Sequence, residues 1–109
     1  MTNPTIVIVA YNRQNALNNL LNSLSRAEYG VDHANLVISI DYSGLHDVYN
    51  LAEDFNWEHG EKIIIKHEKN LGLRHHVLYC GDLSLQYQSV IILEDDLLVS
   101  PSFYLYAKA

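Results

Sequence analysis

The chain of 109 residues contains a single cysteine, Cys80, so it cannot form an internal disulfide. This usage is typical of a reducing compartment, and we expect a cytoplasmic location. No apolar run approaches the ~20 residues that a membrane-spanning helix needs, which leaves peripheral membrane contact open. The first residues have neither a positively charged nor an apolar signal region, so no signal peptide is expected.

The sequence also has little positive charge and no glycine-rich phosphate loop. Its net charge is −6, and no basic stripe is present to neutralise nucleic-acid phosphates, which argues against a nucleic-acid partner. Neither a Walker-type loop nor a G-x-G-x-x-G pattern occurs, and no nucleophile elbow stands out. A site for an anionic substrate would therefore need a cation.

Four short apolar runs rich in β-branched residues are predicted to be strands. They lie at Thr5–Ala10, 35–40, Lys62–Lys66 and 89–93. Their nearly continuous apolar character is typical of parallel strands that are buried on both faces. Helical patterns separate them, so the order predicts right-handed βαβ units. We expect one α/β domain with a mainly parallel sheet in the spatial order 3-2-1-4 and helices on both faces.

The first predicted helix has the clearest pattern, because four leucines recur at the i, i+3, i+4, i+7 spacing of one helical face. These residues are Leu17, Leu20, Leu21 and Leu24. Asn12 or Asn15 is expected to cap its start.

The later helices have weaker signals. The second is expected at about residues 45–55, with Ser43 or Asp47 at its beginning. The third is expected at about residues 73–87. Its inward positions would be Val77, Cys80, Gly81 and Leu85. Ser100 and Pro101 predict the start of a last helix, because serine caps well and proline suits the first helical position.

Three adjacent carboxylates, Glu94, Asp95 and Asp96, follow the fourth apolar run. In open α/β sheets, ligands bind outside the carboxyl ends of the strands. Carboxylate oxygens are the ligands that Mg²⁺ and Mn²⁺ prefer, and these cations bridge proteins to phosphates. A solvated acidic turn is the simpler alternative, but three acids in a row favour a site for a metal ion and a diphosphate.

The other strands also deliver polar residues at their carboxyl ends, which would converge at one edge of a parallel sheet. Arg13 follows the first strand and could hold a phosphate or a base, or could be a surface arginine. Asp41 follows the second and could bind a nucleobase imide or a ribose hydroxyl. A turn aspartate is an equally good interpretation. His75 and His76 are adjacent on a helix and cannot share one zinc ion.

Several segments, in this order, resemble the nucleotide-sugar half of a GT-A glycosyltransferase. The N-acetylglucosaminyltransferase I type is the nearest match, with the broader family 2 transferases behind it. The segments are Ala10-Tyr11-Asn12-Arg13, Ile40-Asp41, Asn70-Leu71-Gly72-Leu73-Arg74-His75, Ile92-Leu93-Glu94-Asp95-Asp96-Leu97 and Ser100-Pro101-Ser102-Phe103. The acidic triplet with the Ser-Pro-Ser-Phe start is the most specific part.

The resemblance implies a role for each site residue. Arg13 would contact the diphosphate or base, Asp41 would bind the uracil, and His75 would approach the nucleotide. Asp96 would bind Mn²⁺ or Mg²⁺ directly, while Glu94 and Asp95 would hold ribose and sugar hydroxyls. The metal ion would offset charge on the departing UDP.

The resemblance further implies that residues 1–109 are the UDP-sugar-binding portion of a transferase that acts on a glycan or another hydroxyl acceptor. The catalytic base and acceptor site would lie in a second half, so we expect a fragment that is prone to self-association and that could bind a sugar nucleotide without transferring the sugar. Two alternatives stay open. One is a Mg²⁺-dependent nucleotidyltransferase or phosphoryl-transfer domain, and the other is a non-catalytic α/β binding module.

Overall fold

The computed structural model describes residues 4–29, 33–87, 89–95 and 104. Its elements follow one another in the order β1 (Thr5–Ala10), α1 (Gln14–Ser25), β2 (Leu36–Ile40), α2 (Asp47–Asp54), β3 (Lys62–Lys66), α3 (Leu73–Asp82), α4 (Ser84–Tyr87) and β4 (Val90–Glu94). Strands and helices alternate along the chain, as the sequence predicts.

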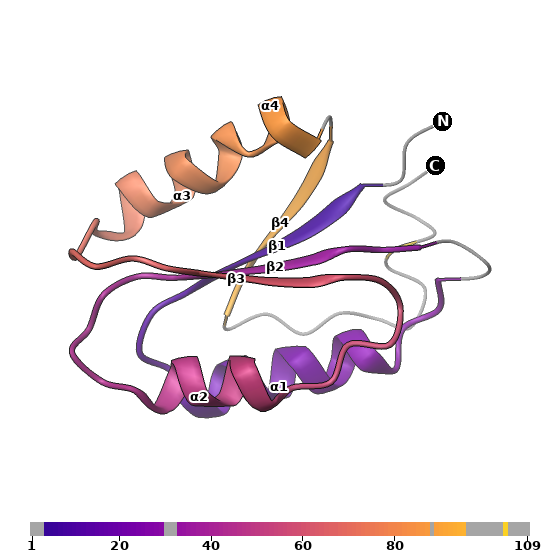
Figure 1. Ribbon diagram of the computed structural model, residues 1–109, viewed down its shortest axis with the longest axis horizontal. Helices are drawn as coiled ribbons and strands as arrows, with labels where there is room; N and C mark the ends of the chain where they lie inside the picture. Colours follow the sequence, from indigo (N-terminus) through magenta and orange to yellow (C-terminus); the bar gives the residue numbers. More distant parts are fainter. Residues whose placement is uncertain (1–3, 30–32, 88, 96–103, 105–109) are drawn as a thin grey trace.

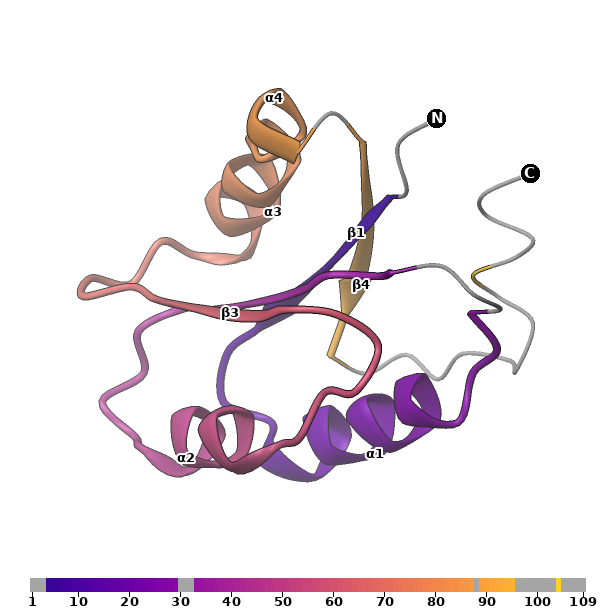
Figure 2. The ribbon, with the colours of Figure 1, turned by 45° about the vertical axis from the view of Figure 1, so that its right-hand side comes forward.

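The four strands form one sheet in the order β3-β2-β1-β4, and every neighbouring pair is parallel. Helices α1 and α2 cover one face of this sheet, and α3 and α4 cover the other (Figures 1 and 2). The predicted strand order and the three-layer α/β architecture are confirmed. Because the strands are parallel, their carboxyl ends lie at the same edge.

Strand β1 is the centre of the packing, since all six of its residues are buried. Its side chains alternate between the two faces. Ile6 and Ile8 join a large cluster under α1 and α2, while Val7 and Val9 join a smaller cluster under α3 and α4. Burial on both faces explains why the run lacks the polar alternation of a half-exposed strand.

Helix α1 buries the predicted leucine face completely, since Leu17, Leu20, Leu21 and Leu24 have no exposed surface. The predicted cap is wrong. Arg13 is the N-cap residue and makes no side-chain capping bond. The chain turns from β1 directly into the helix, and the carbonyl of Arg13 accepts the first helical bond from Leu17 N at 3.0 Å. Asn12 therefore precedes the cap, and Asn15 lies within the first turn.

The predicted third helix is divided into α3 and α4, with a break at Leu83. The change of direction alters which side chains face inward. Leu83 and Cys80 are buried, whereas Leu85 is 88% exposed. The prediction of an inward Leu85 is wrong because it assumed one continuous helical period. Val77 does pack against the core cluster on this face.

Smaller differences concern the ends of other elements. Strands β2 and β4 each begin one residue later than predicted, and β4 extends to Glu94, which pairs with Val9. Helix α2 is shorter than predicted and follows His46 as its N-cap residue. Ser43 instead supports the preceding turn, where its Oγ accepts a bond from Leu45 N at 3.2 Å.

Lys62, the first residue of β3, closes the carboxyl end of α2. Its Nζ donates to the carbonyls of Ala52, Glu53 and Phe55 at 2.7, 2.8 and 2.6 Å. The last carbonyls of a helix have no partner within the helix, and a cation there also interacts favourably with the helix dipole. This ammonium group therefore joins the helix to the neighbouring edge strand.

Tyr104 packs against residues that are distant from it in the sequence. It is fully buried, its ring centroid lies 4.9 Å from that of Tyr29, and its hydroxyl donates to the carbonyl of Pro4 at 3.4 Å. The predicted start of the last helix at Ser100 and Pro101 lies outside the described residues. Within the described part of the chain, no helix has the length and apolar character to cross a membrane.

Replacing Lys62 with methionine should lower the free energy of unfolding by about 1.5 kcal/mol, because bonds from a charged donor are lost. Urea denaturation measures this loss. Lys66→Met, at the other end of β3, is the matched control. The Lys66 Nζ lies only over the Tyr49 ring, at 4.4 Å, and its loss should cost about 0.5 kcal/mol. Equal costs for the two variants would contradict the capping role.

Candidate functional site

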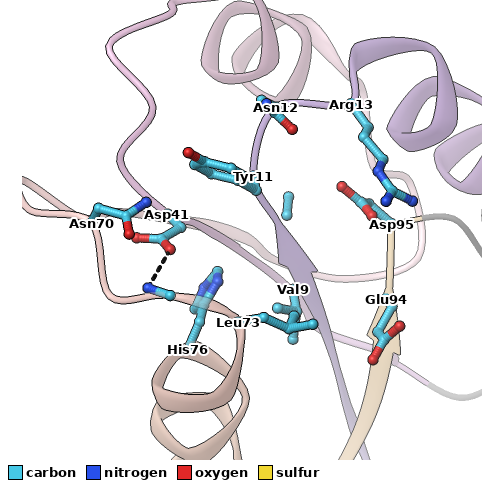
Figure 3. Close-up of a pocket in the computed structure, with 12 residues that line it drawn as sticks. Val9, Tyr11, Asn12, Arg13, Asp41, Asn70, Leu73, His76, Glu94 and Asp95 are labelled. Atoms are coloured by element: carbon cyan, nitrogen blue, oxygen red, sulfur yellow. Dashed lines mark hydrogen bonds between the residues drawn. The ribbon is translucent and has the colours of Figure 1, made fainter.

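A cavity of about 420 Å³ lies where the carboxyl ends of β1, β2 and β4 meet the start of α3. Figure 3 shows its side chains converging from these elements. Its lining residues come from the end of β1 and the following turn (Val9, Ala10, Tyr11, Asn12, Arg13), from Asp41, from the β3–α3 connection and helix (Asn70, Gly72, Leu73, His76), and from Glu94 and Asp95. The predicted convergence at one sheet edge is therefore present in the fold.

Four of the six predicted site residues line this cavity, namely Arg13, Asp41, Glu94 and Asp95. His75 does not. It is exposed on α3, and its Nδ1 lies 3.3 Å from the carbonyl of Leu71. Asp96, the predicted metal ligand, lies outside the described residues.

The carboxylate of Asp41 is buried and accepts three backbone bonds. Oδ1 accepts from Tyr42 N at 2.8 Å and from Leu71 N at 2.7 Å, and Oδ2 accepts from Gly72 N at 3.1 Å. Gly72 has a positive φ of 78°, a conformation that glycine adopts without strain. Asp41 therefore fastens the β3–α3 connection to the end of β2. The turn role that the sequence left open is present, and Oδ2 keeps acceptor capacity.

The opposite side of the cavity carries the charged groups. Arg13 stands at the start of α1, and Figure 3 shows its guanidinium pointing toward the carboxylate of Asp95. Glu94 ends β4 with an exposed side chain at the cavity wall. A planar arginine fork beside acids can interact with an anionic ligand and with the carboxylates at once. The cavity thus has one side with charges of both signs and one side where the Asp41 carboxylate lies among neutral polar groups.

Carboxylates such as Glu94 and Asp95 have the donor chemistry that Mg²⁺ and Mn²⁺ require. Among the described residues, no three His, Cys, Asp or Glu side chains are grouped closely enough to hold a metal ion. The two acids at the end of β4 fit the chemistry of the predicted metal, and the triplet continues into Asp96.

His76 is the lining residue that the sequence reasoning missed. It is 1% exposed and lies four residues before the buried Cys80, which is one turn along the same helical face. That spacing was the available signal, since Cys80 was already predicted to face inward. The imidazole Nε2 lies 2.8 Å from Oγ of Ser39, a buried residue of β2.

The pKa of His76 is held below the ordinary histidine value, first by burial and then by the nearby His67. The Asp41 carboxylate acts in the opposite direction with a smaller effect. His76 is therefore a neutral hydrogen-bonding group in the neutral pH range. Cys80, in the same region, is buried, and burial raises the pKa of its thiol.

Comparisons with known proteins give matches by structure only. No protein-family model and no curated protein matches the sequence. Among solved structures, S. aureus TarS matches with a TM-score of 0.72 at 20% identity, over 95% of this chain and 18% of that chain.

TarS 1-349 has also been solved with ligands. The complex with UDP matches with a TM-score of 0.71 at 19% identity, over 98% of this chain and 31% of that chain. For the complex with UDP-GlcNAc the TM-score is 0.70 at 19% identity, over 98% and 30% of the two chains. The chain thus spans less than a third of each of these TarS structures.

This likeness confirms the fold predicted from the glycosyltransferase resemblance, an α/β nucleotide-binding fold with a parallel sheet in the order 3-2-1-4. The chain has a glycosyltransferase-like fold. The narrower resemblance to the N-acetylglucosaminyltransferase I type stays a prediction, because an identity of 19–20% identifies the fold alone.

Asp41→Asn should loosen the β3–α3 connection, because an amide nitrogen replaces one of the two accepting oxygens. We expect a loss of about 1–3 kcal/mol in the free energy of unfolding. Backbone amide exchange at Leu71 and Gly72 should become faster. Asp82→Asn, at an exposed acid near the end of α3, is the control and should change neither measurement appreciably. Unchanged exchange at both amides would show that Asp41 does not hold this connection.

Proposed function

We propose that this chain binds a UDP-sugar in the cavity at the carboxyl ends of the strands, as the donor-binding portion of a metal-dependent glycosyltransferase. The observation that carries the proposal is the division of one cavity into two chemical ends. Asp41, Asn70 and His76 make a hydrogen-bonding end in which Asp41 is the one acid, while Arg13, Glu94 and Asp95 make an end with charges of both signs. A nucleoside diphosphate has the same division.

The base would lie at the Asp41 end. Three backbone bonds already fix that carboxylate, so its remaining acceptor capacity is held in one direction. An imide N–H is a donor that such an acceptor selects. The ring of Tyr11, 41% exposed at the cavity wall, offers a flat apolar surface beside it. Preorganised groups bind with a smaller loss of entropy.

The diphosphate would lie at the end of β4. Arg13 supplies a guanidinium that can bind phosphate oxygens in a bidentate manner. The acids Glu94 and Asp95 would repel the diphosphate unless a divalent cation, held there and by Asp96, lies between them. When bound, Mn²⁺ or Mg²⁺ would neutralise charge on the departing diphosphate. Arg13 and the acids therefore act together rather than in opposition.

Transfer to a glycan or another hydroxyl acceptor belongs to the same proposal. Two of the TarS structures that match are complexes, one with UDP and one with UDP-GlcNAc, which supports a nucleotide-sugar donor. The chain covers 31% of the TarS complex with UDP. We place the acceptor site and the catalytic base in further residues of a longer protein.

The metal dependence is tested by titrating the chain with UDP in a calorimeter, with and without Mn²⁺. We expect binding to become at least about tenfold tighter with Mn²⁺, which corresponds to about 1.4 kcal/mol. Asp96→Ala should remove this gain. The control Asp47→Ala, at an exposed acid of α2, should keep it. Equal UDP affinity with and without the cation would refute the metal-dependent mode.

The placement of the base is tested by comparing UDP with inorganic pyrophosphate. Asp41→Asn should weaken UDP about 10- to 100-fold, since a charged hydrogen bond contributes about 1.5–3 kcal/mol. Pyrophosphate, which has no base, should bind the variant nearly as well as it binds the original chain. An equal loss for both ligands would assign Asp41 to loop support alone.

A further inference from the structure

Three polar side chains lie between the sheet and α3, next to the cavity. Oγ of Ser39, on β2, lies 2.8 Å from Nε2 of His76 and 2.9 Å from Nε2 of His67, which follows β3. The two imidazole rings are 5.2 Å apart at an interplanar angle of 80°. One buried hydroxyl therefore joins two histidines.

The hydroxyl of Ser39 has a single hydrogen, so it can donate to only one of these nitrogens. The other histidine must then donate its own Nε2–H to Oγ. When both rings are neutral, each carries one N–H, so the two histidines adopt opposite tautomers. A change in the protonation of one ring is passed to the other by rotation of the Ser39 hydroxyl.

The two histidines face different cavities. His76 lines the main cavity, and His67 lines a second cavity of about 80 Å³ beside the loop that precedes α2. Among the described residues, no fully buried side-chain nitrogen or oxygen lacks a hydrogen-bond partner. Nε2 of His76 is bonded to Ser39 and the ring lines the main cavity, so we infer that Nδ1 is the ring atom available to a ligand there. Figure 3 shows the ring beside the Asp41 carboxylate.

We propose that His76 is a further ligand-contacting residue of the main cavity, and that Ser39 and His67 are positioning residues that decide whether its Nδ1 acts as donor or acceptor. The inference rests on the proposed function, because the ligand is the nucleotide part of the UDP-sugar.

The positions of the hydrogens on Ser39 and the two imidazoles determine how protonation of His67 changes Nδ1 of His76. A protonated His67 must donate through Nε2 to Ser39, which then donates to Nε2 of His76. Nδ1 of His76 consequently carries a hydrogen and becomes a donor, while the His76 ring itself stays neutral. The carbonyl, ribose and phosphate oxygens of a nucleotide offer more acceptors than donors. If Nδ1 of His76 is an acceptor in the neutral pair, protonation of His67 turns it into a donor and should therefore strengthen binding.

Other titratable groups surround the two histidines. They are Asp41 after β2, Tyr79 and Cys80 on α3, Lys66 on β3, and His46 and Tyr49 at the second cavity. Only a histidine ordinarily changes charge between about pH 6 and about pH 8. His46 is therefore the neighbour in this set whose effect must be separated from that of His67.

The test measures binding of UDP-GlcNAc at constant Mn²⁺ from about pH 8 to about pH 6, the range in which histidines titrate. The diphosphate of this ligand is esterified at both ends, so it gains no proton in this range. Affinity for the unmodified chain should rise about fivefold as the pH falls, which is the effect of one hydrogen bond. Ser39→Ala and His67→Gln should both bind with a flat pH profile.

His46→Gln is the matched control, because His46 is exposed, lines the second cavity and makes no side-chain cap bond to α2. It should keep the pH dependence of the unmodified chain. If Ser39→Ala does not fold, the half-buried His67→Gln variant decides the result.

Nitrogen-15 NMR of the imidazoles in the free chain gives a second measurement that does not depend on any ligand. His67 and His76 should show opposite tautomers at about pH 8, and Ser39→Ala should abolish this relation. UDP-GlcNAc should then shift the His76 signals.

The possible failures are distinguishable. If UDP-GlcNAc does not bind the unmodified chain, the proposed function fails together with the ligand contact of His76, and NMR still decides whether the two tautomers are linked. If the ligand binds but Ser39→Ala keeps the full pH dependence, or if the two histidines share one tautomer, the positioning role is overturned.

Discussion

The parallel pairing of β1 with β2 on one side and β4 on the other is the constraint on which the remaining structure depends. Because β1 is buried on both faces, it requires a layer of helices above and another below. Parallel pairing also brings the carboxyl ends of the strands to one edge, where the sheet can no longer satisfy its own polar groups. The cavity with its polar lining lies at that edge.

Asp41 extends this constraint from the sheet to the helix above it. Its carboxylate holds Leu71 and Gly72 through their backbone N–H groups, and α3 begins at the next residue. The position of α3 in turn places His76 against Ser39 of β2. A single buried acid thus links the strand end, the connection and the helix. The same carboxylate that lines the cavity therefore also holds this local geometry.

The distribution of charge makes the two sides of the cavity chemically different. One side carries the buried Asp41 carboxylate beside His76, and burial lowers the pKa of that imidazole. The other side carries Arg13, Glu94 and Asp95. Figure 3 shows the Arg13 side chain directed toward Asp95. A ligand with a polar head and an anionic tail fits this arrangement in one orientation. Acids outnumber the one arginine among the charged lining residues, as they do in the chain with its net charge of −6, so an anionic ligand would need a cation there.

The sequence by itself determined the class of fold, the strand order and most of the polar residues at the sheet edge. Continuous β-branched runs and regular leucine spacing depend on local periodicity, which the sequence displays directly. Only the tertiary structure decided that α3 breaks at Leu83, that Arg13 rather than an asparagine stands at the α1 cap, and that His76 rather than His75 lines the cavity. These features depend on how a helix turns over the sheet, and on contacts such as that of Ser39 with His76, which are 37 residues apart in the sequence. Such contacts leave no local pattern, because neither partner alone indicates the other.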